Sequence, residues 1–300
     1  MAETGFKYLD FNVLARISNM QLLAKVVVEG FLLGLHRSPY RGFSVEFAEH
    51  RQYSPGDEIR YIDWKVYAKT DRHYVKQFEE ETNLACHIIL DASNSMNYRS
   101  SEKHPGKLDY AARLTACLAY FIMNQRDAVG LAVFDRRIRE LLPARLRHSH
   151  LQRILATLDG LKPGGETDIA RPLHDLAESL KRRGLVILIS DLLDDPDRVL
   201  SALQHFRFAG HDLLVFHVMD PAELTFPFET MTEFTDLETD EKTLVSPDGM
   251  RPVYLDGLRR FLDRVEKGCV DLRADYKLMN TSKPLEMALS EYLYRRSRMG

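Results

Sequence analysis

The segment at residues 185–190, LVILIS, constrains the fold more than any other part of the sequence. All of its residues except the last are apolar, so a strand here would need burial on both faces. Such a strand is typical of the middle of a parallel sheet that has helices on each side. Similar apolar segments occur at residues 84–90, 128–134 and 213–218. The chain is therefore expected to contain a mostly parallel sheet.

Helical segments separate these strands. Apolar residues recur at helical spacing over residues 108–122, 150–158 and 169–180, and Gly184 is expected to close the last of these helices. Strands and helices that alternate in this way predict an α/β fold with a doubly wound, mostly parallel sheet.

Residues 222–252 interrupt the alternation of strands and helices. They contain Pro227 and a Ser-Pro-Asp-Gly turn at residues 246–249, which favour a β-hairpin insertion. After this insertion, helices are expected over residues 253–268 and 283–297.

The first part of the chain has a different character. Helical spacing of apolar residues predicts an N-terminal helix near residues 10–35. Two short segments of alternating character, residues 43–47 and 74–78, predict a small β-rich element. We therefore divide the chain into residues 1–82, with this helix and the β-rich element, and residues 83–300, with the α/β domain and its insertion.

Composition narrows the class of protein. Apolar residues make up 45% of the 300 residues and charged residues 28%, as in soluble globular proteins. A net charge of -3 gives no reason to expect a nucleic-acid partner. The three cysteines are odd in number and widely spaced, which predicts reduced thiols and a cytoplasmic protein. The apolar run at residues 22–35 is too short for a membrane span, and no signal peptide is recognisable.

Oxygen-bearing side chains follow two of the predicted strands. Asp91, Ser93 and Ser95 come directly after the first strand of the α/β domain, and Asp191 follows the LVILIS strand. Thr167 lies in a glycine-rich loop between them. Because ligands bind outside the carboxyl ends of parallel strands, we expect these side chains to lie close together.

These five side chains form a candidate site for a hard cation. Carboxylate and hydroxyl oxygens suit Mg²⁺, with Mn²⁺ or Ca²⁺ as alternatives. The pattern lacks the Cys and His ligands that zinc prefers. Five oxygens do not complete an octahedral shell, so one position is left for water or for a carboxylate from another molecule.

The pattern Asp91-x-Ser93-x-Ser95, followed by Thr167 and Asp191, resembles the metal-ion-dependent adhesion site of von Willebrand factor A domains. That family has the alternating α/β fold inferred above. The resemblance implies that the two serines and the threonine bind the metal directly, and that the two aspartates balance its charge directly or through water. It also implies that an acidic side chain of a partner protein fills the open position.

A second resemblance covers nearly the whole chain. The segment EHRQYSPGDEIRYIDWK at residues 49–65, together with Ile-Ser-Asp at residues 189–191, is similar to the bacterial domain-of-unknown-function family 58. This resemblance implies a partner, because members commonly lie beside MoxR-type AAA+ ATPases and are thought to help them remodel or activate client proteins. Many members carry amino-terminal membrane helices, which we do not expect in this chain.

Arg60, Asp63 and Trp64 belong to a dense cluster of charged and aromatic residues in the first part of the chain. They are interpreted either as an ion-pair network that holds the β-rich element on the α/β domain, or as a surface that binds a partner. The sequence leaves both interpretations open.

The sequence favours a binding protein over an enzyme. Phosphatases of the haloacid dehalogenase type need a second carboxylate two residues after the first, and that position is Ser93. No nucleophile elbow or phosphate-binding loop is recognisable. We therefore predict a non-enzymatic, Mg²⁺-dependent protein-binding adaptor. The alternatives are an Mg²⁺-dependent phosphohydrolase and a structural subunit with a vestigial metal site.

Overall fold

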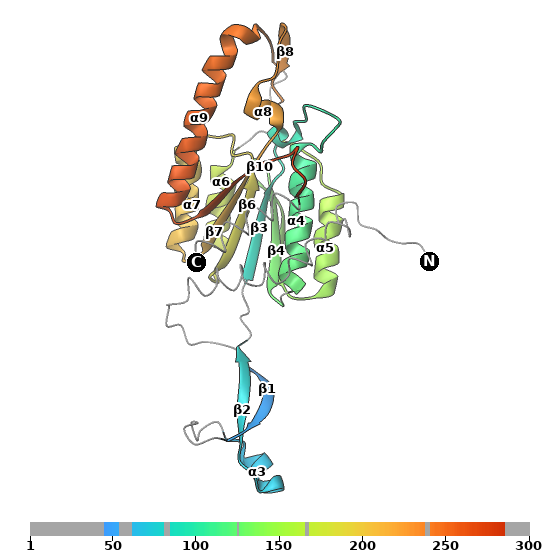
Figure 1. The fold of residues 1–300 in the computed structure, drawn as a ribbon, viewed down its shortest axis with the longest axis vertical. Coiled ribbons are helices and arrows are strands. Elements are labelled where there is room, and N and C mark those ends of the chain that lie inside the picture. Colours follow the sequence, from blue (N-terminus) through green and yellow to red (C-terminus); the bar gives the residue numbers. More distant parts are fainter. Residues whose placement is uncertain are drawn as a thin grey trace, which may run out of the picture. The chain divides into compact units, whose positions relative to one another are not determined.

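The computed structural model describes residues 45–53, 62–80, 85–124, 126–165, 168–237 and 241–285. The chain divides into two compact units, and the smaller unit is Leu35–Asn83. Among the described residues, the larger unit is built on a six-stranded sheet with the order β10-β7-β6-β3-β4-β5 (Figure 1). The strands are β3 (Ala85–Asp91), β4 (Ala128–Phe134), β5 (Ile138–Arg145), β6 (Gly184–Ser190), β7 (Asp212–Met219) and β10 (Asp275–Asn280).

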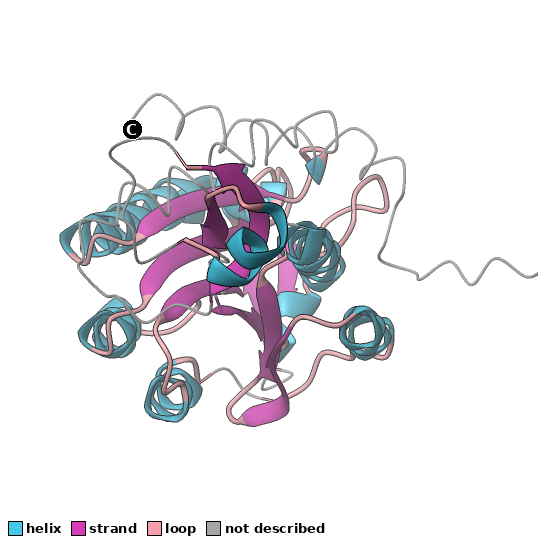
Figure 2. Ribbon diagram, turned by 90° about the horizontal axis from the view of Figure 1, so that it is seen from below, coloured by secondary structure: helices cyan, strands magenta, loops and turns pink. Residues whose placement is uncertain are grey.

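The sheet is mostly parallel and is covered by helices on both faces, as predicted. β5 runs antiparallel to β4, whereas the other strands pair in parallel. Figure 2 shows the helices on the two sides of the sheet. One face packs against α4 (Lys107–Asn124) and α5 (His148–Asp159). The other face packs against α6 (Ala170–Ser179), α7 (Pro196–Phe208) and α9 (Pro247–Asp271).

The position of β6 in the sheet explains why the first five residues of the LVILIS segment are all apolar. Leu185, Ile187 and Ile189 join the core beneath α4 and α5. Val186 and Leu188 point the other way and join the core beneath α6, α7 and α9. Each fully buried side chain of this kind stabilises the fold by roughly 1.5–3 kcal/mol relative to an exposed one. β6 therefore ties the two cores together, and the prediction of a strand buried on both faces is confirmed.

Strands β5 and β10 lie at the two edges of the sheet and were not predicted from the sequence. Of the eight residues of β5, all of them described, only Leu142 is buried. Of the six residues of β10, all of them described, only Met279 is buried. An edge strand needs little apolar surface, so these two segments carry almost no hydrophobic signal.

The prediction that Gly184 closes a helix is wrong. Helix α6 ends at Ser179, and Gly184 is the first residue of β6. A Cβ at this position would overlap the carbonyl oxygen of Ala85 on the neighbouring strand β3. The close approach of two strands, and not a helix cap, therefore requires glycine here.

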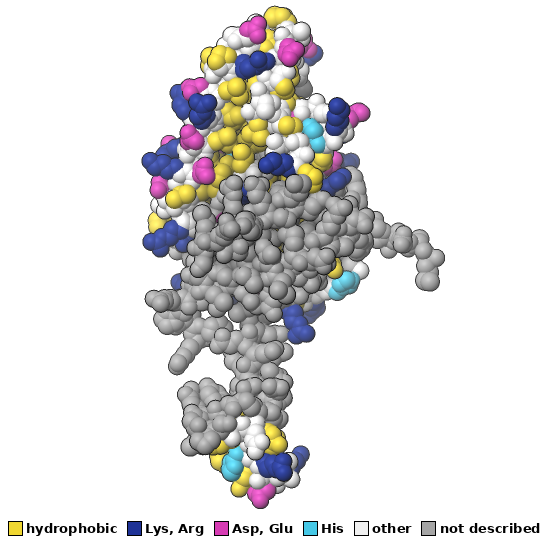
Figure 3. Space-filling view, viewed as in Figure 1, with side chains coloured by type: hydrophobic (Ala, Val, Ile, Leu, Met, Phe, Trp, Pro, Cys, Tyr) yellow, Lys and Arg dark blue, Asp and Glu magenta, His cyan; other side chains and the backbone are white. Residues whose placement is uncertain are grey.

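The predicted hairpin insertion is confirmed, and it begins with a short helix. α8 (Pro221–Thr225) leads to β8 (Thr232–Thr235), which pairs antiparallel with β9 (Lys242–Val245). Phe226 packs against Phe234 of the hairpin and against Tyr254 of α9, with ring centroids 5.7 and 5.0 Å apart. These contacts hold the insertion on the first half of α9. Four hydrophobic side chains of the insertion and of the first half of α9 are exposed: Met231, Leu244, Met250 and Val253. Figure 3 shows hydrophobic side chains gathered on one face of the larger unit.

Helix α9 confirms the helix predicted over residues 253–268 and extends it in both directions. The description ends at residue 285, so the helix predicted over residues 283–297 falls almost wholly outside it. The helix predicted near residues 10–35 also lies outside the described residues. Among the residues described, none of the helices combines the length and apolar character that a membrane span requires.

The smaller unit contains the predicted β-rich element. β1 (Val45–Gln52) and β2 (Tyr74–Glu80) pair antiparallel, with an irregularity in register between Phe47 and Glu49. Between them lies α3 (Trp64–Thr70), a short helix that was not predicted from the sequence. 

The close approach at Gly184 generates a prediction about stability. Gly184→Ala should lower the free energy of unfolding by about 1–3 kcal/mol, because the methyl group forces β6 away from β3. Gly249→Ala is the matched control, since a Cβ at this position on α9 meets nothing within 4 Å. Urea denaturation followed by circular dichroism would measure both. Equal midpoints for the two variants would contradict the account of Gly184.

Candidate metal centre

The candidate site lies at the carboxyl ends of β3 and β6, which are neighbours in the sheet. Leu90 pairs with Ile189, Asp91 is the last residue of β3, and Asp191 comes directly after Ser190, the last residue of β6. Both aspartates are almost fully buried, with 0% and 1% of their surface exposed. The parallel register therefore brings together two carboxylates that are 100 residues apart in the sequence.

Asp91 is held by hydrogen bonds to both of its carboxylate oxygens. The backbone N–H of Ser93 donates to Oδ1 at 2.9 Å, and the hydroxyl of Ser190 donates to Oδ2 at 2.6 Å. The hydroxyl oxygens of Ser93 and Ser95 lie 3.0 Å apart. Two hydroxyls and a fixed carboxylate are thus gathered just beyond the end of β3.

The glycine-rich loop before Thr167 is bound to the same turn. The N–H of Gly164 donates to the carbonyl of Ala92 at 3.0 Å, and the N–H of Asn94 donates to the carbonyl of Gly165 at 3.1 Å. Gly165 has a φ of 80°, and a Cβ there would meet the Asp135 carboxylate at 2.9 Å. Thr167 itself lies outside the described residues. The structure therefore brings together Asp91, Ser93, Ser95 and Asp191, and it leaves the place of Thr167 a prediction.

Burial of two like charges changes the acidity of the site. Burial is the main cause that raises the pKa of Asp91 to about 7, and the negative charge of Asp191 raises it further. The hydrogen bonds from Ser190 and Ser93 act in the opposite direction. A cation between these groups would stabilise the ionised form of Asp91.

A buried lysine occupies one side of the site. The Lys107 ammonium donates to Asp191 Oδ2 at 2.8 Å and to Glu223 Oε1 at 2.7 Å, and its side chain has 0% of its surface exposed. Burial alone would lower the pKa of Lys107, but the charges of Asp191 and Glu223 outweigh it, so the pKa is raised and the ammonium stays charged. Sequence reasoning missed Lys107 and Glu223, because a single charged residue at the start of a helix is usually a solvated one.

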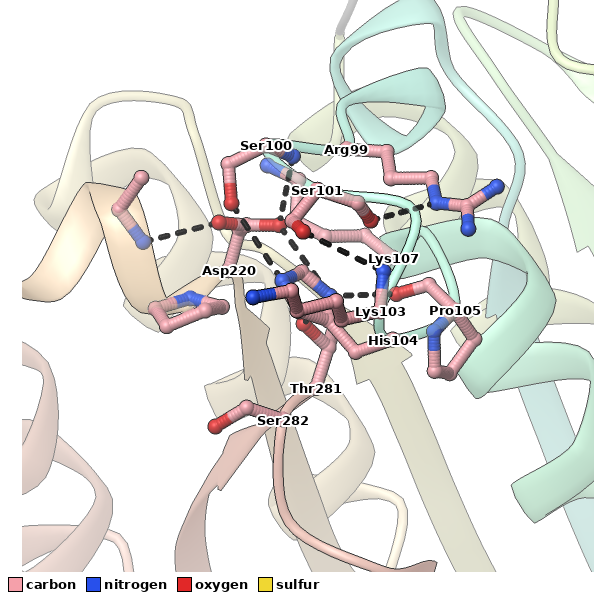
Figure 4. A network of polar contacts seen from close by, with 12 residues as sticks. Arg99, Ser100, Ser101, Lys103, His104, Pro105, Lys107, Asp220, Thr281 and Ser282 are labelled. Carbon is pink, nitrogen blue, oxygen red and sulfur yellow. Dashed lines mark hydrogen bonds and ion pairs between the residues drawn. The ribbon is translucent and has the colours of Figure 1, made fainter.

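Glu223 links this lysine to Asp220, whose contacts with the loop before α4 are seen in Figure 4. Asp220 is the N-cap of α8, and its N–H donates to Glu223 Oε2 at 2.8 Å in a capping box. The carboxylate of Asp220 also accepts from the N–H of Ser100 at 3.1 Å and lies 3.8 Å from His104 Nδ1. The loop that follows the two serines is therefore joined to the start of the insertion.

The described donors fit a hard divalent cation. Ser93 and Ser95 supply neutral oxygens, and Asp91 and Asp191 supply charged ones, which is the mixture that Mg²⁺ and Mn²⁺ accept. In the described parts of the chain, no group of three or more His, Cys, Asp or Glu side chains could hold a metal. A site of the zinc type or a cage of several carboxylates is therefore not found there.

The second candidate cluster lies in the smaller unit. Asp63 is buried, and its Oδ1 accepts from the N–H of Val66 at 3.3 Å, at the start of α3. Trp64 is 56% exposed and packs edge-on against Tyr67 and His73. Arg60 lies outside the described residues. Asp63 thus has a local structural role, and the exposed ring of Trp64 keeps the interpretation as a partner-binding surface open.

The fold and the site define an α/β domain with an oxygen-lined site at the carboxyl edge of its sheet. Residues 49–260 match the family described as Protein of unknown function DUF58, and the chain belongs to this family. It is 28% identical over 221 residues to the uncharacterized proteins Rv1480 of Mycobacterium tuberculosis and Mb1516 of Mycobacterium bovis. This similarity covers 73% of the chain and 68% of each relative.

Several solved structures resemble the chain. BatB from Bacteroides thetaiotaomicron is 18% identical with a TM-score of 0.45, over 72% of this chain and 99% of that one. An aerotolerance-related membrane protein from Bacteroides fragilis is 18% identical with a TM-score of 0.48, over 72% and 100% of the two chains. The von Willebrand factor A domain of SpRpn10 is 12% identical with a TM-score of 0.40, over 70% and 95%. Because all three TM-scores are below 0.5, the fold class rests on the strand order of the sheet.

The raised pKa of Asp91 generates a prediction about pH. The pKa of an unfolded aspartate is about 3.9, so between about pH 4 and about pH 7 the folded protein binds more protons than the unfolded chain. The free energy of unfolding should therefore fall as the pH rises through this window. Asp91→Asn removes the titrating carboxyl group and with it this pH dependence. In EDTA, the free energy of unfolding of Asp91→Asn relative to wild type should therefore rise by about 1–3 kcal/mol from pH 4 to pH 7.

Urea denaturation at a series of pH values would measure this difference. Asp256→Asn, which removes an exposed carboxylate of α9, controls for the loss of one charge. If the free energies of unfolding of wild type and Asp91→Asn changed in parallel with pH, burial would not raise the pKa of Asp91.

Proposed function

We propose that the chain is a non-enzymatic, Mg²⁺-dependent adaptor that binds an acidic side chain of a partner protein. Asp91, Ser93, Ser95, Thr167 and Asp191 would hold the metal, with Mn²⁺ or Ca²⁺ as alternatives. The observation that carries the proposal is the pair of buried carboxylates beside two hydroxyl oxygens that lie 3.0 Å apart. 

The composition of the site supports a metal that stays electrophilic. Neutral hydroxyls bind a cation without cancelling its charge, so the bound ion retains attraction for an anion. A carboxylate from a partner would satisfy that attraction and would fill the position that the chain leaves open.

The geometry favours binding over catalysis. In a phosphohydrolase of the type considered above, Asp91 would attack the substrate and a carboxylate two residues later would act as acid and base. Ser93 occupies that position, and both oxygens of Asp91 accept hydrogen bonds from the chain itself. The second alternative, a structural subunit with a vestigial site, predicts partner binding that is indifferent to metal.

The family suggests the partner. We propose a MoxR-type AAA+ ATPase, whose remodelling or activation of client proteins the adaptor would assist. We also propose that the protein acts in the cytoplasm. All three cysteines belong to the described part of the chain, and they are buried thiols that form no disulfide, as suits a reducing compartment.

The proposal predicts that partner binding depends on the metal. A purified MoxR-type ATPase from the same genome should bind the immobilised protein in Mg²⁺, and EDTA should abolish that binding. Thr167→Ala should weaken it at least roughly tenfold, because each lost ligand loosens the metal. Ser201→Ala, on an exposed position of α7, is the matched control. Biolayer interferometry would measure the affinities.

Two results would contradict this proposal. Binding that is unchanged by EDTA and by Thr167→Ala would favour the structural subunit and would direct attention to the exposed Trp64. Steady Mg²⁺-dependent hydrolysis of a phosphate ester that is lost in Asp91→Ala would favour the phosphohydrolase.

A further inference from the structure

The candidate metal site contains a cation of its own. Lys107 is the first residue of α4, and its ammonium lies 2.8 Å from an oxygen of Asp191. A lysine that is fully buried is costly to the fold unless it is paired. Here the paired group is one of the two aspartates that would balance the charge of a bound metal.

The ammonium is fixed in place by the insertion. Glu223 accepts from Lys107 through Oε1 at 2.7 Å and from the N–H of Asp220 through Oε2 at 2.8 Å. The hydroxyl of Tyr254 donates to the backbone carbonyl of Glu223 at 2.9 Å. The ring of Tyr98 lies 5.8 Å from the ammonium, within reach of a cation–π contact. Lys107 therefore has little freedom to leave when a metal arrives.

The charge of Lys107 affects how the site binds cations and anions. Asp91, Asp191 and Glu223 are acidic, and Lys107 offsets one of them. His217 faces Asp191 and stays neutral, because burial lowers its pKa to about 4. A fixed positive charge next to a metal ligand repels a divalent cation and attracts an anion.

We propose that Lys107 is a built-in counter-ion that weakens binding of the metal alone and strengthens binding of an anionic carboxylate to the metal-loaded site. The inference rests on the function proposed above. The bound metal attracts the carboxylate directly, and because coupling between two ligands is reciprocal, each of them promotes the binding of the other. The site fills when cation and acidic partner arrive together, and Glu223 acts as the positioning residue that keeps the ammonium beside Asp191.

A charge series tests this inference. Lys107→Met removes the positive charge at similar length, Glu223→Gln removes a negative charge, and the double variant removes both. Lys103→Met is the matched control, since Lys103 is an exposed lysine of the loop that leads into α4. Calorimetry would measure the affinity for Mg²⁺. Relaxation of the acetate methyl protons would measure binding of acetate to the Mn²⁺-loaded protein.

Lys107→Met should bind Mg²⁺ at least roughly tenfold more tightly than wild type, a change of about 1.4 kcal/mol. Its Mn²⁺-loaded form should bind acetate at least roughly tenfold more weakly. Glu223→Gln should shift both affinities the opposite way, and the double variant should lie between the two single ones. Should Lys107→Met fail to fold, the order of the Mg²⁺ and acetate affinities of Glu223→Gln, the double variant and wild type tests the inference.

The possible failures are distinguishable. If wild type binds Mg²⁺ and the affinities do not follow the charge series, the inference about Lys107 falls and the proposed metal site stands. If neither wild type nor any variant binds Mg²⁺ or Mn²⁺, both fall. Tight Mg²⁺ binding by Lys107→Met together with none by wild type would support the inference.

Discussion

The burial of two carboxylates at the ends of neighbouring strands is the constraint on which the site depends. Asp91 and Asp191 lie side by side because β3 and β6 pair in parallel register. Like charges in a buried place repel each other, so the surrounding groups must supply positive charge or hydrogen-bond donors. Ser190 and the N–H of Ser93 serve Asp91, whereas Lys107 serves Asp191. The two acids are thus held differently, although they belong to one site.

The fold gives this arrangement its rigidity. β6 is buried on both faces, so the loop that follows it begins from the best-packed strand of the sheet. The capping box of α8 fixes Glu223, and Glu223 fixes Lys107, so the insertion contributes to the site without supplying a predicted ligand. A change in the insertion would therefore reach Asp191 through two hydrogen bonds. This connection gives the insertion a role in setting the electrostatic character of the site.

The sequence predicted those parts that leave a local signal. The apolar LVILIS segment and its helical neighbours predicted the doubly wound sheet, and strand ends predicted where Asp91, Ser93, Ser95 and Asp191 meet. β5 and β10 were not predicted, because edge strands bury few side chains. Leu142 is the buried residue of β5, and Met279 is that of β10. Lys107 and Glu223 were not predicted as site residues for another reason. Their role depends on contacts across 84 and 116 residues of chain, which no local spacing reveals.

The most direct test of the central claim is a crystal structure of the protein with Mn²⁺, read from the anomalous signal of the metal. The account predicts one strong peak bound by the hydroxyl oxygens of Ser93 and Ser95, with Asp91 and Asp191 beside it. It also predicts that Lys107 remains paired with Glu223. An anomalous map without a peak at this edge of the sheet, from crystals with ample Mn²⁺, would contradict the account.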